Sequence, residues 1–90
     1  MKTYYIVDIM DDQGGYFIEY YESEKKAVEA YSDYLLHLTK NELKHIQDGY
    51  AMVYTVETNI NLFDEEESEG YVPYNHIKDI IKRYHQGDEI

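Results

Sequence analysis

The start of the chain shows the alternating pattern and the turn signals of a β-hairpin. Aromatic and β-branched residues dominate residues 4–10 and 16–21, where every second side chain would lie on the same face of a strand. Residues 11–15 include two adjacent glycines, which favour a turn because glycine adopts positive φ angles without steric cost. The pattern therefore predicts a hairpin with a loop of about five residues.

The apolar spacing then changes from two residues to three or four, which is typical of a helix. Ser23 is a suitable N-cap, and the helical pattern covers residues 24–38. Thr39 and Glu42 have the spacing of a capping box. A short second helix, or a kinked continuation of the first, is therefore predicted to reach about residue 47.

The second half of the chain predicts one long strand, a loop and a final helix. Residues 50–58 alternate as a third strand, and residues 59–70 have the least regular pattern. Residues 70–74 are compatible with a short edge strand, because a proline is tolerated there. A helical pattern over residues 76–85 predicts the last helix. Its apolar stripe would consist of Ile77, Ile80, Ile81 and Tyr84.

The predicted order is β-β-α-(α)-β-(β)-α, which indicates an α+β fold of two layers. We expect an antiparallel or mixed sheet of three to four strands, with the helices on one face. The 90 residues form a single domain, 1–90, without an internal repeat or a linker. A chain this short buries only about 60–65% of its unfolded surface, so a homodimer or a bound partner would add useful stability.

Negative charge is concentrated in two parts of the chain. The protein has 19 acidic and 8 basic residues, for a net charge of −11. Residues 3–24 have a net charge of −6, and residues 59–74 one of −5. If the hairpin and the late loop lie on one side, the domain has a strongly negative face. Repulsion among these carboxylates destabilises a small domain, which suggests a basic partner. The negative charge also disfavours direct binding to nucleic acid or to an anionic membrane.

The sequence lacks the residues that several classes of function require. There is no cysteine, which excludes disulfides, thiolate zinc sites and cysteine nucleophiles. Residues 11–15 lack the spacing of a calcium loop, and no histidine pair has zinc-site spacing. No serine has a nucleophile-elbow context, and no glycine-rich phosphate loop is present. We therefore expect no enzyme activity, no catalytic residue, no metal and no cofactor.

The N-terminal residues and the apolar segments predict a cytoplasmic protein. A charge at Asp8 comes too early for the apolar region of a signal peptide. No stretch approaches the 18 apolar residues of a transmembrane helix. We therefore expect an intracellular protein that does not contact a membrane.

The acidic run at residues 64–69 is the main candidate for a binding surface. In an extended chain, alternate side chains on one face are roughly 6.6 Å apart. This spacing is close to that of phosphates along a nucleic-acid strand, so a groove that neutralises phosphates would also attract the carboxylates. The alternative is that the run is a solvated loop, as most charge runs are.

In its size, lack of cysteine, acid-rich α+β pattern and tyrosines interleaved with acids, the chain resembles the small acidic inhibitors of bacteriophages and mobile elements. These include anti-CRISPR, anti-restriction and uracil-DNA glycosylase inhibitor proteins, many of which imitate DNA. The resemblance is one of composition over the whole chain, and it assigns no role to any residue. It implies stoichiometric inhibition of a nucleic-acid-binding enzyme.

The leading hypothesis is therefore an inhibitor that occupies the basic nucleic-acid-binding groove of a host nuclease or its complex. The alternatives are an immunity or antitoxin protein that neutralises a basic toxin, and a homo-oligomeric accessory domain. The expected charged contacts are Glu19, Glu22, Glu24, Asp64, Glu65, Glu66, Glu67 and Glu69. The expected apolar anchors are Tyr20, Tyr21 and Tyr71.

Overall fold

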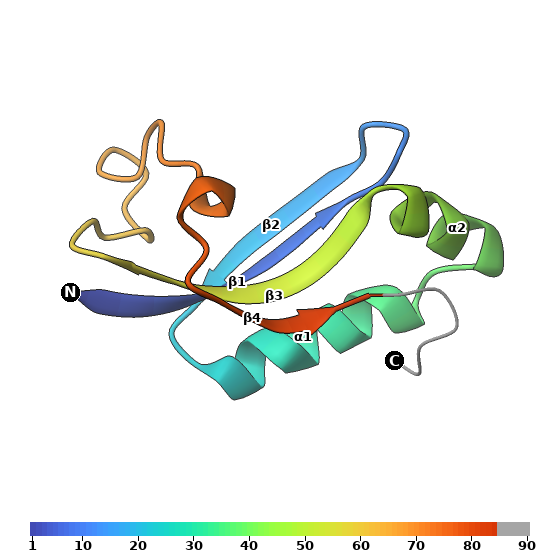
Figure 1. The fold of residues 1–90 in the computed structure, drawn as a ribbon, viewed down its shortest axis with the longest axis horizontal. Helices are drawn as coiled ribbons and strands as arrows, with labels where there is room; N and C mark the ends of the chain where they lie inside the picture. The colour runs from blue at the N-terminus through green and yellow to red at the C-terminus, as the bar shows by residue number, and fades with distance from the viewer. Residues whose placement is uncertain (85–90) are drawn as a thin grey trace.

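Four antiparallel strands form a single sheet in the computed structural model, which describes residues 1–84 (Figure 1). The strands lie in the order β2-β1-β3-β4. The central strands β1 and β3 pair along their whole length, from Lys2 opposite Thr58 to Met10 opposite Tyr50. The bounds of the strands are Lys2–Met10 for β1, Tyr16–Tyr21 for β2, Tyr50–Thr58 for β3 and Asp79–Arg83 for β4.

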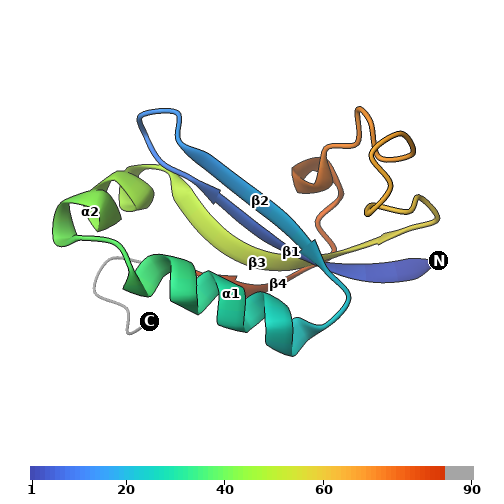
Figure 2. The ribbon, with the colours of Figure 1, turned by 180° about the vertical axis from the view of Figure 1, so that it is seen from behind.

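Two helices, α1 (Glu24–Leu36) and α2 (Lys40–Asp48), cover one face of this sheet, which we call the helix face (Figure 2). The predicted capping box is confirmed at the start of α2. The Thr39 hydroxyl accepts a hydrogen bond from the Glu42 amide at 3.2 Å, and the Glu42 carboxylate accepts one from the Thr39 amide at 3.0 Å. Neither helix is long and apolar enough to cross a membrane.

The main core lies between the helices and the odd-numbered positions of the central strands. Helix α1 buries residues one turn apart, as the helical apolar spacing predicts. The strands contribute β-branched residues and an alanine, which leaves room for the larger helix side chains. The buried residues of this core are Val7, Ile9, Ala27, Tyr31, Leu35, Ile46, Ala51 and Val53.

A second apolar cluster lies on the opposite face, which we call the loop face because residues 59–78 cover part of it. Leu62 is only 3% exposed. The Tyr4 hydroxyl donates to the carbonyl of Ile60 at 3.1 Å and accepts from the amide of Leu62 at 3.4 Å. This part of the loop is therefore fixed to the sheet. The buried residues of the second cluster are Tyr4, Ile6, Met52, Tyr54, Val56 and Leu62.

The predicted fold class is confirmed, because the structure is α+β with a four-stranded antiparallel sheet and both helices on one face. The prediction for the end of the chain is wrong. Residues 70–74 are not a strand, and the 3₁₀ turn Pro73–His76 and strand β4 replace the expected helix at 76–85. Residue 85 lies outside the part that the structure describes.

The outer edge of β3 explains this difference. Without β4, the backbone groups along that edge would lack partners within the sheet. An irregularity between Val53 and Tyr54 shifts the register of the β3–β4 pair. Ile81 packs on the helix-face core, whereas Ile77 packs on the loop-face cluster. Ile81 therefore fits a strand as well as it would fit a helical stripe, whereas Ile77 lies before β4.

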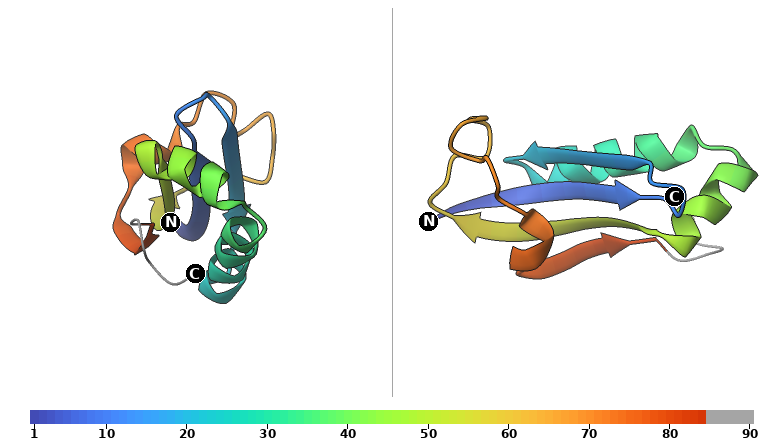
Figure 3. Two further views of the ribbon diagram at one scale, coloured as in Figure 1. Left: turned by 90° about the vertical axis from the view of Figure 1, so that its right-hand side faces the viewer. Right: turned by 90° about the horizontal axis from the view of Figure 1, so that it is seen from above.

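The hairpin turn and the acidic loop lie at opposite ends of the molecule. The hairpin turn and α2 are at one end of the long axis, whereas the N-terminus and the loop after β3 are at the other (Figures 1 and 3). The molecule measures 39 × 25 × 19 Å. The two acidic regions therefore do not combine through the hairpin turn to form one negative face.

Gly49 should be intolerant of a side chain, because it ends α2 directly against the hairpin. A Cβ at this position would lie 2.0 Å from the carbonyl oxygen of Met10. We expect Gly49→Ala to lower the free energy of unfolding by about 3 kcal/mol in urea titrations. Gly14→Ala is the matched control, since a Cβ there meets no atom and only the positive φ of 87° opposes it. Gly14→Ala should lower the free energy of unfolding by about 1 kcal/mol. Equal losses in the two variants would contradict the proposed close approach at Gly49.

Candidate functional site

The acidic residues at the start of α1 and those of the loop after β3 lie at the same end of the molecule (Figure 1). Phe63, from the loop, lines an open hollow together with Glu22 and Lys26, which lie next to the end of β2. The acidic residues after β2 are therefore neighbours of the acidic loop. We call the exposed side chains of Glu22, Glu24 and residues 64–69 the acidic end.

Glu19 lies apart from this group. It is exposed in the middle of the edge strand β2, opposite Val7 of β1. Its partner Val7 faces the helices, so Glu19 is on the helix face of the sheet. The hollow places Glu22 beside Phe63, the residue before the acidic run, and α1, whose first residue is Glu24, begins at the same end of the molecule (Figure 1). Glu19 does not share this position.

The acidic loop is folded into successive turns, so the predicted extended row of carboxylates is wrong. The Asp64 carboxylate accepts hydrogen bonds from the amides of Glu66 at 2.9 Å and Glu67 at 3.2 Å. The Glu67 carboxylate accepts one from the amide of Asn61 at 3.1 Å. Asp64 and Glu67 therefore shape the loop. The three acidic side chains that remain for a partner are those of Glu65, Glu66 and Glu69.

Basic residues offset part of the charge at this end. Lys2 pairs with Glu22 at 2.5 Å, and this hydrogen bond raises the pKa of Lys2. The other close contacts between basic and acidic side chains within residues 1–84 are those of His45 with Asp12 and of Lys78 with Glu57. None of these pairs reaches Glu65, Glu66 or Glu69. The acidic loop is therefore the least neutralised part of the acidic end.

The three predicted tyrosine anchors do not form one patch. Tyr20 and Tyr21 are adjacent on β2, so they lie on opposite faces of the sheet. Tyr21 packs on the helix-face core. Tyr20 and Tyr71 share the loop face, where Tyr71 stacks on His76 with the ring centroids 4.9 Å apart.

The structure also shows a buried carboxylate that the sequence analysis did not select. Asp8 is fully buried on the loop face, directly opposite Ile18 of β2 and Met52 of β3. Its carboxylate accepts hydrogen bonds from the hydroxyls of Tyr50 at 3.0 Å and Tyr54 at 2.5 Å. No ion pair within the described chain involves Asp8. Its carboxylate is therefore held by tyrosine hydroxyls rather than by a base.

Tyrosines occupy all four diagonal positions around Asp8 in the neighbouring strands. We call Tyr16, Tyr20, Tyr50 and Tyr54 the tyrosine cluster. Diagonal neighbours in a sheet are close enough for aromatic side chains to interact. The sequence did contain a signal, because a tyrosine recurs four positions apart in both strands that pair with β1. That signal depends on the strand order, which the sequence alone did not provide.

Burial and the Asp8 carboxylate keep the hydroxyls of this cluster protonated. Burial, followed by the charge of Asp8, raises the pKa of Tyr16 to about 12. Burial is also the largest cause of the raised pKa values of Tyr50 and Tyr54, and the hydrogen bond to Asp8 is the next. The cluster therefore suits hydrogen-bonding recognition better than proton abstraction at neutral pH.

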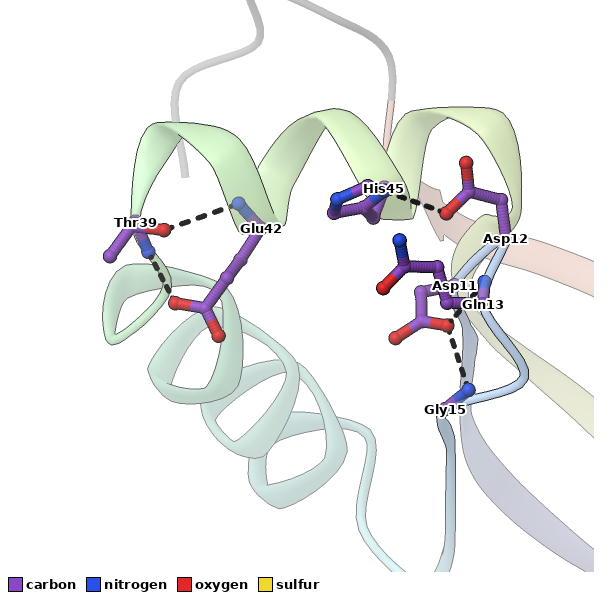
Figure 4. A network of polar contacts seen from close by, with 7 residues as sticks. All are labelled: Asp11, Asp12, Gln13, Gly15, Thr39, Glu42 and His45. Atoms are coloured by element: carbon purple, nitrogen blue, oxygen red, sulfur yellow. Dashed lines mark hydrogen bonds and ion pairs between the residues drawn. The ribbon is translucent and has the colours of Figure 1, made fainter.

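The carboxylates of the hairpin turn are used by the fold itself (Figure 4). The Asp11 carboxylate accepts hydrogen bonds from the amides of Gln13 at 2.9 Å and Gly15 at 2.7 Å. Asp12 contacts the Nδ1 atom of His45 at 2.8 Å, which joins the turn to α2. The predicted turn at residues 11–15 is confirmed. Residues 1–84 contain no group of three or more side chains placed to hold a metal ion.

Comparisons with protein-family models, with curated proteins and with solved structures found no match for this chain.

The raised pKa of Tyr16 should make the fold sensitive to alkaline pH. An unfolded tyrosine loses its proton near its ordinary pKa of 10.0, whereas folded Tyr16 keeps its proton up to about 12. Between these values the unfolded state binds fewer protons, so the free energy of unfolding falls as the pH rises. The contribution of Tyr16 is complete below pH 10 and is lost as the pH passes about 12. NMR titration of ¹³C-labelled tyrosine rings, together with urea unfolding at several pH values, would measure both effects.

Asp8→Asn is the informative variant for this titration. It removes the charge but leaves the burial, so the pKa of Tyr16 should move only part of the way toward 10.0. A wild-type Tyr16 that titrates at its ordinary value would contradict the described environment.

Proposed function

We propose that this protein is a stoichiometric inhibitor that binds the basic nucleic-acid-binding groove of a host nuclease or its complex. It would act as phage-type anti-CRISPR and anti-restriction DNA mimics do, in the cytoplasm of the host cell and without a cofactor. The acidic end is the proposed contact surface. The main support is that the acidic loop has its own fixed fold, with Glu65, Glu66 and Glu69 exposed.

The anchoring of this loop favours binding because little order must be gained in the complex. Leu62 is buried against the sheet, and the ring of Phe63 meets that of Tyr4 edge-on, with their centroids 5.6 Å apart. The Asp64 and Glu67 carboxylates hold the turns that follow. A surface that is ordered before binding loses less conformational entropy when a partner docks.

The charge of the whole chain supports the same proposal. A net charge of −11 attracts a cationic groove over a distance and repels free nucleic acid. Binding of this kind is fast and strongly dependent on salt. The folded loop changes the basis of the mimicry, because its carboxylates form a compact group rather than an evenly spaced row. The proposed likeness to nucleic acid is therefore one of charge density, not of phosphate spacing.

Neutralising the three free carboxylates of the loop should weaken binding to a basic partner. We expect the combined variant Glu65→Gln, Glu66→Gln and Glu69→Gln to lose affinity by at least about tenfold at physiological salt, where exposed charges more than about 8 Å apart are largely screened from each other. The matched control is Glu29→Gln, Asp33→Asn and Asp48→Asn, which removes the same charge from exposed positions on the helices. The control should bind within about threefold of the wild type, because long-range attraction alone is screened by salt.

The partner for this measurement would be captured from host lysate, identified and purified. Its binding to DNA or RNA is then measured with increasing amounts of the inhibitor. Competitive loss of nucleic acid binding would support the proposal. A partner that keeps its nucleic acid, or equal losses in the two triple variants, would contradict it. A captured toxin whose surface does not bind nucleic acid would instead favour an immunity function.

A further inference from the structure

Part of the tyrosine cluster reaches the surface of the loop face, where residues 59–78 do not fully cover it. Tyr16 is 52% exposed, and Tyr50 and Ile18 are half-buried. Tyr74, which is 48% exposed, meets Tyr50 with the ring centroids 5.4 Å apart. Exposed aromatic rings therefore lie close to Tyr50, which is hydrogen-bonded to the buried Asp8.

Asp8 determines how the hydroxyls of this surface are oriented. A tyrosine hydroxyl has a single hydrogen to donate. Tyr50 and Tyr54 donate theirs to the Asp8 carboxylate. Asp8 and the Tyr50 hydroxyl also affect the pKa of Tyr16, so the Tyr16 hydroxyl lies close to both groups. A hydroxyl that has donated its hydrogen can only accept a further hydrogen bond. The oxygen of Tyr50, a half-buried residue, can therefore only accept a hydrogen bond from a further group.

The charge of this site points in the same direction. The buried Asp8 carboxylate has no ion-pair partner in the described part of the chain. The faces of aromatic rings carry partial negative charge and attract cations. The complementary group is therefore a cation with N–H donors and a flat surface that stacks on a ring. The guanidinium of arginine has this combination, whereas the compact and strongly hydrated ammonium of lysine does not stack in this way.

We propose that Tyr16, Tyr50 and Tyr74, together with the buried Asp8, form a binding site for an arginine side chain of a partner protein. The proposal deepens the proposed function and rests on it in one respect, since a basic groove would supply the arginine. The site itself is separate from the acidic end. It uses none of the loop carboxylates, so each surface can be tested alone.

A set of three matched peptides tests the site directly. The probe is N-acetyl-Gly-Arg-Gly-amide, and the comparison peptides replace arginine by citrulline, its neutral analogue, or by lysine. In NMR titrations of the full chain, the arginine peptide should shift the ring signals of Tyr16, Tyr50 and Tyr74. The citrulline peptide should cause no saturable shift, and the lysine peptide should bind at least about threefold more weakly. Equal binding of arginine and lysine, or of arginine and citrulline, would overturn the proposal.

Variants then connect the binding to the residues named. Asp8→Asn keeps the size of the side chain but removes the charge, and its amide can itself donate to the tyrosines. It should weaken binding of the arginine peptide by about tenfold or more. Tyr16→Phe keeps the ring and removes one hydroxyl, and it should weaken binding of the arginine peptide by about threefold. Tyr34→Phe is the control, since Tyr34 stacks on Phe17 on the helix face, and it should bind as the wild type does.

These variants remain decisive if the buried substitution prevents folding. Tyr16 is on the surface, so Tyr16→Phe alone decides in that case, and unchanged affinity would overturn the proposal. The experiment also separates the two proposals. Loss of the arginine site with intact capture of a basic protein would reject this inference alone. Intact peptide binding without any basic partner would reject the proposed inhibition and leave the arginine site in place.

Discussion

The pairing of β1 with β3 is the constraint on which the rest of the structure depends. The two strands match over their full length and are buried on both faces of the sheet. Because side chains alternate, a shift of one residue would exchange the two faces completely. The observed register places Val7 and Val53 against the helices. It places Asp8 among the tyrosines on the other face, so the core and the candidate sites both follow from this register.

Asp8 makes that register more specific. A buried carboxylate is costly unless it is well hydrogen-bonded, and here tyrosine hydroxyls provide the partners. In the shifted register the same carboxylate would face the apolar layer around Leu35, where the buried residues of the strands offer no hydroxyl. This arrangement also accounts for part of the high tyrosine content, which is twelve in a chain of 90 residues. Several of these tyrosines fill a thin layer with their rings, and two donate hydrogen bonds to the Asp8 carboxylate.

Local signals predicted most of the fold, and long-range pairing explains what they did not predict. The hairpin, both helices and β3 follow from apolar spacing, two glycines and the capping box at Thr39. Strand β4 was missed because Ile77, Ile80, Ile81 and Tyr84 also fit a helix, and only the free edge of β3 favours a strand. The acidic residues were identified by composition. The role of Asp8 was missed because its tyrosine partners lie on two other strands, from 8 to 46 positions away.

The two faces of the sheet therefore have different consequences for function. The helices close one face and leave their own acids dispersed on exposed turns. The loop closes only part of the other face, and it brings its carboxylates to the same side of the sheet as the tyrosine cluster (Figure 1). A partner that lies across this side would meet exposed carboxylates at one end and acceptor hydroxyls toward the other. Both surfaces favour cationic groups, but by different means: the loop by charge that salt screens, and the cluster by stacking and directed hydrogen bonds that salt affects less. In the proposed complex, the first accelerates association and the second fixes the orientation of the partner.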